Sequence, residues 1–207
     1  MLKGWLSHYF HRQQLLAKQA CTQRYIIIDL ELTGLDPKQH EIVSIAWLMI
    51  EQQCIKLNAA QHKVNSDVKS LAQSPIFHGI AKQDIAQGQS LESILQELSH
   101  HFSDAILVFH NAVLDWGFLK LAFKAHAIKA QPSLLLDTFQ IEKKRLHQQG
   151  HEIALNDLTL SECRKRYQLP HYSSHHALTD ALATAELFLA QCHQISCGKK
   201  LKLGELI

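Results

Sequence analysis

The sequence predicts an α/β domain with a mixed β-sheet flanked by α-helices. Apolar, β-branched runs that predict strands come first and follow one another without a helix between them. Further along, strand-like runs alternate with segments whose apolar residues recur at helical spacing. A meander of strands followed by strand and helix alternation is typical of a mixed sheet with helices packed on it.

The elements can be predicted in chain order. Short apolar runs predict strands at residues 25–30, 42–50, 54–64, 105–109 and 133–136. One apolar stripe predicts the first helix of the domain, and it consists of Leu91, Ile94, Leu95, Leu98 and Phe102. Later helices are predicted at residues 114–126, 138–148, 158–167 and 176–194.

Composition is consistent with one globular domain. The chain has 207 residues, of which 46% are hydrophobic, and no linker or repeat divides it. Its five cysteines are odd in number and form no Cys-x-x-Cys pair, which favours reduced thiols in a cytoplasmic protein over disulfides or zinc. The net charge is only +2, so attraction of nucleic acid by the whole molecule would be mild. No run is long and apolar enough to predict a transmembrane segment.

Two carboxylates stand at the end of the first predicted strand. Because side chains alternate between the two faces of a strand, Asp29 and Glu31 share one face. Neighbouring buried carboxylates repel each other and lose hydration unless a cation neutralises them. Hard oxygen ligands select Mg²⁺ or Mn²⁺, so the pair predicts a divalent metal site.

Three short motifs extend this site over most of the chain. The first joins Asp29 and Glu31 to Leu32, Thr33 and Gly34. The second consists of His110, Asn111 and Asp115, and the third of His175, Ala177 and Asp180. A His-Gly-Ile string beginning at His78 lies between the first two motifs.

In order and spacing these motifs resemble the DEDDh family of 3'-to-5' exonucleases, typified by the proofreading exonuclease of bacterial DNA polymerase III. The resemblance covers residues 25–190 and implies a ribonuclease H-like fold. Leu32 departs from the family pattern, which has threonine at that position.

The resemblance implies a two-metal-ion hydrolysis that releases nucleoside 5'-monophosphates from a 3' end. Asp29 would bridge two Mg²⁺ or Mn²⁺ ions. Glu31 and Asp180 would hold the ion that carries the attacking water, and Asp115 would hold the second ion. His175 would accept the proton of that water.

Several neighbouring residues need a choice between two roles. His175 rather than His176 is predicted to be the base, because it stands five residues before Asp180, as in the histidine branch of the family. The residues predicted to contact the substrate are Leu32, Thr33, Gly34, His78, His110 and Asn111. For Gly34 an ordinary turn, and for Asn111 a role in fixing the loop before Asp115, explain the residue equally well. Asp137 is predicted to be a helix N-cap rather than a fifth catalytic acid.

The sequence also predicts three segments. Residues 1–24 form an N-terminal amphipathic helical extension, residues 25–195 the exonuclease domain and residues 196–207 a short basic tail. Leu2, Trp5, Leu6, Tyr9, Leu16 and Ala20 approximate a helical stripe in the extension. Packing of this helix on the domain is the default, while membrane-surface contact, a transit peptide and partner binding stay open.

Substrate and partners are less sharply indicated. We expect single-stranded DNA or RNA 3' ends as substrates, with DNA favoured over RNA. The alternatives are a proofreading subunit of a DNA polymerase, an RNA 3'-end trimming enzyme and a catalytically silent nucleic-acid-binding module. A DNA polymerase or a repair complex would be the partner. The short segment after the last predicted helix, without a long linker, favours a free-standing exonuclease, and the oligomeric state stays open.

Overall fold

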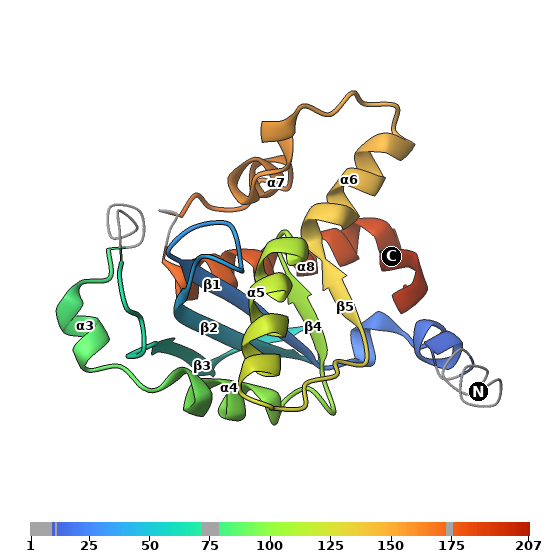
Figure 1. Ribbon diagram of the computed structural model, residues 1–207. Coiled ribbons are helices and arrows are strands. Elements are labelled where there is room, and N and C mark those ends of the chain that lie inside the picture. The colour runs from blue at the N-terminus through green and yellow to red at the C-terminus, as the bar shows by residue number, and fades with distance from the viewer. Residues whose placement is uncertain (1–9, 11, 72–78, 173–175) are drawn as a thin grey trace.

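The protein is described by a computed structural model that covers residues 10, 12–71, 79–172 and 176–207. A five-stranded mixed sheet with the strand order β3-β2-β1-β4-β5 forms its centre (Figure 1). The strands are β1 (Tyr25–Leu32), β2 (Ile42–Glu51), β3 (Cys54–Val64), β4 (Ile106–Phe109) and β5 (Leu135–Asp137).

The pairing of the strands changes from antiparallel to parallel at β1. β1 pairs antiparallel with β2, and β2 pairs antiparallel with β3, so the first three strands form a meander. β1 pairs parallel with β4, and β4 pairs parallel with β5. The predicted mixed sheet is therefore confirmed, and the parallel half brings the carboxyl ends of β1, β4 and β5 to the same edge.

Helices cover both faces of the sheet (Figure 1). The longer helices are α4 (Leu91–Ser99), α5 (Ala112–Ala125), α6 (Thr138–Gln148) and α8 (Ala177–Ser196). Apolar residues of α4 and α5 pack with Ile26, Ile28 and Trp47 on one face of the sheet. Alanines of α8 pack with Ile27 and Leu48 on the other face. The small side chains let α8 approach the sheet closely, which matters because α8 carries Asp180.

Some helix boundaries differ from the predicted ones. Helix α6 has the predicted bounds, and α8 begins one residue later than predicted. Helix α5 begins two residues earlier than predicted, because Asp137 accepts the backbone N–H of Ala112 from a neighbouring strand end. The helix predicted at residues 158–167 is α7 (Leu160–Arg166), which begins two residues later because Thr159 has extended backbone and caps it. The short 3-10 helix η2 (Leu155–Leu158) precedes it. Helix α3 (Lys82–Ala86) was not predicted.

Both ends of the described chain pack on the domain. The backbone N–H of Ala20 donates to Leu201 O at 2.8 Å, and that of Leu203 donates to Lys18 O at 3.0 Å. The core includes Leu15 and Ala20 together with three leucines near the C-terminus: Leu201, Leu203 and Leu206. The lysine-rich segment after α8 is thus held by buried leucines. The division of the chain at residues 24 and 195 stays a prediction.

Candidate active site and metal centre

The acids of the first motif occupy the face of β1 that is covered by α8. Residues Tyr25 and Ile27 on this face belong to the core beneath α8, and alternation carries Asp29 and Glu31 to the same side. The β1–β2 register shifts directly after Glu31, so that Glu31 pairs with Ser44 and Leu32 with Ile42. This β-bulge lies next to the acids, a position where bulges often redirect a side chain.

Helix α8 brings the last acid to the first two. Asp180 is the fourth residue of α8, and its backbone N–H donates to His176 O at 3.0 Å in the first helical turn. One carboxylate oxygen each of Asp29, Glu31 and Asp180 lie within 4.8 Å of one another. Residues about 150 positions apart in the sequence therefore form one compact oxygen cluster.

Asp115 approaches from the opposite layer. It lies in the first turn of α5 and is 6% exposed. Its charge is close enough to raise the pKa of Asp29. Asp115 does not belong to the 4.8 Å triad, so the four acids form a triad with one outlying member.

Burial and mutual repulsion both raise the pKa values of the acids. Burial raises the pKa of Asp29 well above its ordinary value, and the charges of Asp115, Asp180 and Glu31 raise it further. Burial, with Asp180 beside it, raises the pKa of Glu31 to about 7. Burial is also the main cause of the raised pKa of Asp115. No described lysine or arginine forms an ion pair with Asp29, Glu31 or Asp115.

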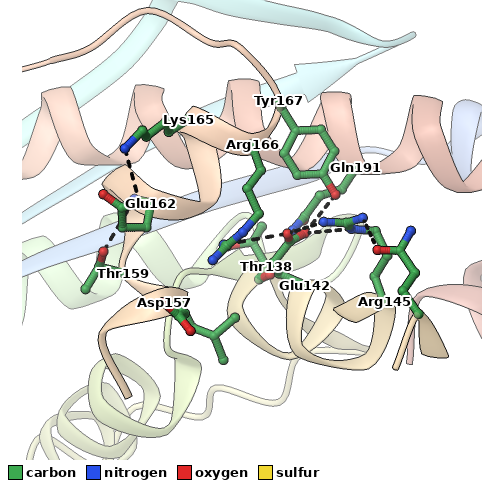
Figure 2. Close-up of polar contacts among 12 residues, drawn as sticks. Thr138, Glu142, Arg145, Asp157, Thr159, Glu162, Lys165, Arg166, Tyr167 and Gln191 are labelled. Carbon is green, nitrogen blue, oxygen red and sulfur yellow. Dashed lines mark hydrogen bonds and ion pairs between the residues drawn. The ribbon is translucent and has the colours of Figure 1, made fainter. Parts of the chain in front are cut away.

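Glu142 on α6 shows how this protein compensates a buried carboxylate when no metal is involved (Figure 2). Its side chain is fully buried, but Arg145 donates to it at 2.6 Å and the Tyr167 hydroxyl at 2.8 Å. Gln191 adds a longer contact from α8 at 3.5 Å. Burial alone would raise the pKa of Glu142, but these donors more than offset burial and hold the pKa below its ordinary value.

The contrast with Glu142 decides what the acid cluster fits. Asp115 is 6% exposed, Glu31 is 9% exposed and Asp29 is half-buried, yet no described lysine or arginine forms an ion pair with any of them. Carboxylate oxygens are hard ligands, and the three from Asp29 and Glu31 on β1 and Asp180 on α8 lie close enough together to hold a divalent cation. The residues present therefore fit a divalent metal site.

Asp137 has a structural role, and the prediction that it caps a helix is confirmed. Its Oδ1 accepts the N–H of Phe139 at 2.9 Å at the start of α6. The same side chain also accepts the N–H of Asn111 at 2.9 Å and of Ala112 at 3.0 Å, at the start of α5. One carboxylate thus caps two helices, and the second cap was missed because β4 and β5 become neighbours only in the sheet.

Both ring nitrogens of His110 bond within the protein. Nε2 lies 3.0 Å from Leu158 O, and Nδ1 lies 2.8 Å from Thr138 Oγ1. Burial lowers the pKa of His110 to about 4, so the ring is neutral. A carbonyl can only accept, so Nε2 carries the proton and donates to Leu158 O, while Nδ1 lies beside the Thr138 hydroxyl, which itself contacts Phe109 O at 3.2 Å. These contacts favour a structural role for His110, and its predicted substrate contact stays a prediction.

The residues after Glu31 form a loop held by its own contacts. Thr33 Oγ1 accepts the N–H of Glu41 at 2.9 Å, and the Thr33 N–H donates to Glu41 O at 3.0 Å. A Cβ on Gly34 would lie 2.2 Å from the His40 ring, which explains why this position has glycine. Asn111 has the left-handed backbone conformation, with φ of 70°, at the start of α5. Leu32 is half-buried and packs against the core. The predicted substrate contacts of these four residues stay predictions.

His175 and His78 lie outside the described residues. The structure does describe His176, whose ring packs on that of His62 with centroids 4.9 Å apart. His62 belongs to β3 and pairs with Ala46, which in turn pairs with Asp29. His176 therefore has a neighbour on the sheet, which the sequence did not indicate.

Comparison with known families agrees with this geometry. Residues 26–188 match the family model RNase_T, described as exonuclease. The chain belongs to this exonuclease family. The matched range contains the four acids, the whole core on the α4 and α5 face of the sheet and most of the core beneath α8.

The relatives include a DNA polymerase and a 3'-5' exonuclease. The chain is 28% identical over 182 residues to "DNA polymerase III PolC-type" of Thermotoga maritima, covering 88% of this chain and 13% of that protein. It is 30% identical over 168 residues to "3'-5' exonuclease DinG" of Bacillus subtilis, covering 81% of this chain and 17% of that protein. The chain therefore spans less than a fifth of the length of these two relatives.

A solved structure confirms the fold. The nuclease domain of 3'hExo, a DEDDh family member bound to rAMP, aligns with a TM-score of 0.69. The two chains are 13% identical, and the alignment covers 92% of this chain and all of that domain. In the described part of this chain, no helix is long and apolar enough to cross a membrane.

Proposed function

We propose that this protein is a 3'-to-5' exonuclease that hydrolyses single-stranded nucleic acid, DNA in preference to RNA, to nucleoside 5'-monophosphates. The observation that carries the proposal is the cluster of Asp29, Glu31 and Asp180, with Asp115 beside it and no described cation pairing with Asp29, Glu31 or Asp115. Membership of an exonuclease family and a relative named as a 3'-5' exonuclease support it.

The four acids would hold two Mg²⁺ or Mn²⁺ ions. Asp29 would serve both ions, because it belongs to the triad with Glu31 and Asp180 and the charge of Asp115 also acts on it. Glu31 and Asp180 would hold one ion together with Asp29, and Asp115 would hold the second. When bound, two such ions would stabilise the attacking and departing oxygens of the phosphodiester displacement.

His175 is proposed as the base that accepts the proton of the attacking water. It stands five residues before Asp180 and two before the start of α8. A histidine has an ordinary pKa near neutrality, so it can take up and release this proton under physiological conditions.

DNA is the proposed substrate class because relatives named DNA polymerase III PolC-type match most of this chain. The alternative of RNA trimming is supported by the rAMP in the 3'hExo nuclease domain. The PolC-type relatives favour association with a DNA polymerase or repair complex as a second possibility. The described cysteines are free thiols, which fits the proposed cytoplasmic location.

The test is a panel of 3'-labelled and 5'-labelled oligonucleotides, as DNA and RNA and in single- and double-stranded form. We expect metal-dependent release of labelled nucleoside monophosphate from the 3' label, and a ladder of shortened products from the 5' label. Full activity in a chelator would contradict the metal role. Internal cleavage without a ladder would contradict exonuclease action.

A further inference from the structure

The side-chain hydroxyl of Ser44 on β2 is buried and has no hydrogen-bond partner among the described residues. Its side chain is fully buried. A buried hydroxyl without a partner lowers stability, so such a group needs an explanation. On the same face of β2, the following residues are Ala46, Leu48 and Ile50, all apolar members of the core beneath α8.

The strand register identifies the polar neighbour of Ser44. Ser44 pairs directly with Glu31 on β1 and with Val64 on β3. Directly paired residues point to the same face, with Cβ atoms about 4.5–5.5 Å apart. Glu31 is thus its only polar cross-strand partner, and the hydroxyl lies on the face of the acid cluster.

The β-bulge after Glu31 strengthens this placement. The register steps from Ser44 to Ile42 while β1 advances by one residue, so Val43 is the extra residue of the bulge. The bulge adjoins the Glu31–Ser44 pair and ends regular pairing there. Ser44 is consequently the last β2 residue held in strict register with the acid strand.

We propose that Ser44 is a positioning residue of the metal centre: its hydroxyl donates to the Glu31 carboxylate, or to a water held beside it, when a divalent cation is bound. The inference rests on the proposed metal-dependent function. A bound cation would draw Glu31 and its waters into a fixed arrangement, and a donor at this point would orient the carboxylate. Groups of this kind raise metal affinity about 10- to 100-fold.

The test measures Mn²⁺ affinity of the full chain by calorimetry and by the electron paramagnetic resonance of free Mn²⁺, without nucleic acid. Ser44→Ala should weaken Mn²⁺ binding about 10- to 100-fold. Ser44→Thr, which keeps the hydroxyl, should stay near wild-type affinity. The control is Ser93→Ala on the exposed side of α4, which should leave affinity unchanged.

Thermal unfolding without metal separates this role from a merely structural one. Because the Ser44 hydroxyl has no partner without metal, Ser44→Ala should unfold at the same or a higher temperature than wild type. Equal Mn²⁺ affinity of wild type and Ser44→Ala, or a metal-free loss of stability that explains the weaker binding, would overturn the role of Ser44. Absence of Mn²⁺ binding by wild type would overturn the proposed function together with this role.

Discussion

At the residue scale, Asp29 is the acid whose ionisation is opposed by burial and by three other carboxylates. Each acid raises the cost of ionising the others, and burial adds to it. The same chain satisfies Glu142 with an arginine and a tyrosine, so uncompensated acids are not a general feature of its interior. The cluster therefore fits a site in which a bound divalent cation neutralises the carboxylates.

Replacing Asp29 by Asn should abolish turnover and leave the fold intact. The change removes the bridging ligand but also removes repulsion among the acids, so the metal-free variant should unfold at the same or a higher temperature. Oligonucleotide hydrolysis and thermal unfolding measure the two effects. Undiminished activity of Asp29→Asn would contradict the two-metal proposal.

The two adjacent histidines should differ in their effect on rate. His175→Ala should lower the single-turnover rate by roughly 10²–10⁴-fold, the usual contribution of a positioned base. His176→Ala should cost little, since its described contact is the ring of His62 rather than an acid. His62→Ala is the matched control for loss of that contact. A large loss of rate in His176→Ala with a near-normal rate in His175→Ala would show that His176, not His175, is the base.

At the element scale, Asp137 connects the two helices that follow the parallel strands. It caps α6 and accepts two N–H groups at the start of α5, the helix that carries Asp115. The position of Asp115 therefore depends on a side chain from a different strand. Asp180 lies in the first turn of α8, where its backbone N–H donates to the carbonyl of the N-cap residue His176.

Asp137→Ala should destabilise the protein by about 1–3 kcal/mol, because buried N–H groups lose their acceptor. Asp157→Ala is the control, since Asp157 accepts a single N–H, that of Ala154, in an exposed turn. Urea unfolding should show the larger loss for Asp137→Ala. Equal losses in the two variants would contradict the double-cap role.

At the scale of the whole molecule, the acids couple stability to pH and to metal. The pKa of Glu31 is raised from its ordinary 4.5 to about 7, so the folded state binds this proton more tightly than the unfolded state. Without metal, the free energy of unfolding should therefore fall as pH rises through this range. Asp29, whose pKa is also raised, acts in the same direction.

Urea unfolding at about pH 5 and about pH 8 measures this coupling. In a chelator the protein should be less stable at the higher pH, and Mn²⁺ should stabilise it more there, because the acids bind metal when ionised. Glu31→Gln should flatten the pH dependence. Unchanged stability across the range in wild type would contradict the repulsion among the acids.

The N-terminal segment should contribute to the stability of the whole molecule. A chain that begins at Gln23 should keep its hydrolysis of short oligonucleotides, because the described acids all lie beyond that point. It should unfold at a lower temperature, since it loses Leu15 and Ala20 from the core and the Ala20 carbonyl that accepts from Tyr25 at 2.7 Å. Loss of hydrolysis with an intact fold would show that residues 1–22 help to build the site.

The sequence by itself determined the features that depend on local pattern. Alternation put Asp29 and Glu31 on one face, and apolar spacing predicted α6 with its bounds and α8 within one residue at its start. The order of strands and helices along the chain predicted a mixed sheet, and the motifs predicted the family to which the chain belongs. These inferences succeed because side-chain alternation and helical periodicity are properties of neighbouring residues.

Only the tertiary structure decided which distant groups meet. The sheet brings Asp137 to the start of α5, the β1–β2 register sets Ser44 opposite Glu31, and packing buries Leu203 with the N-terminal segment. Compensation of Glu142 by Tyr167 likewise requires α6 and α7 to pack together. Such pairs depend on strand register and helix packing between residues far apart in the chain, and no local pattern encodes them.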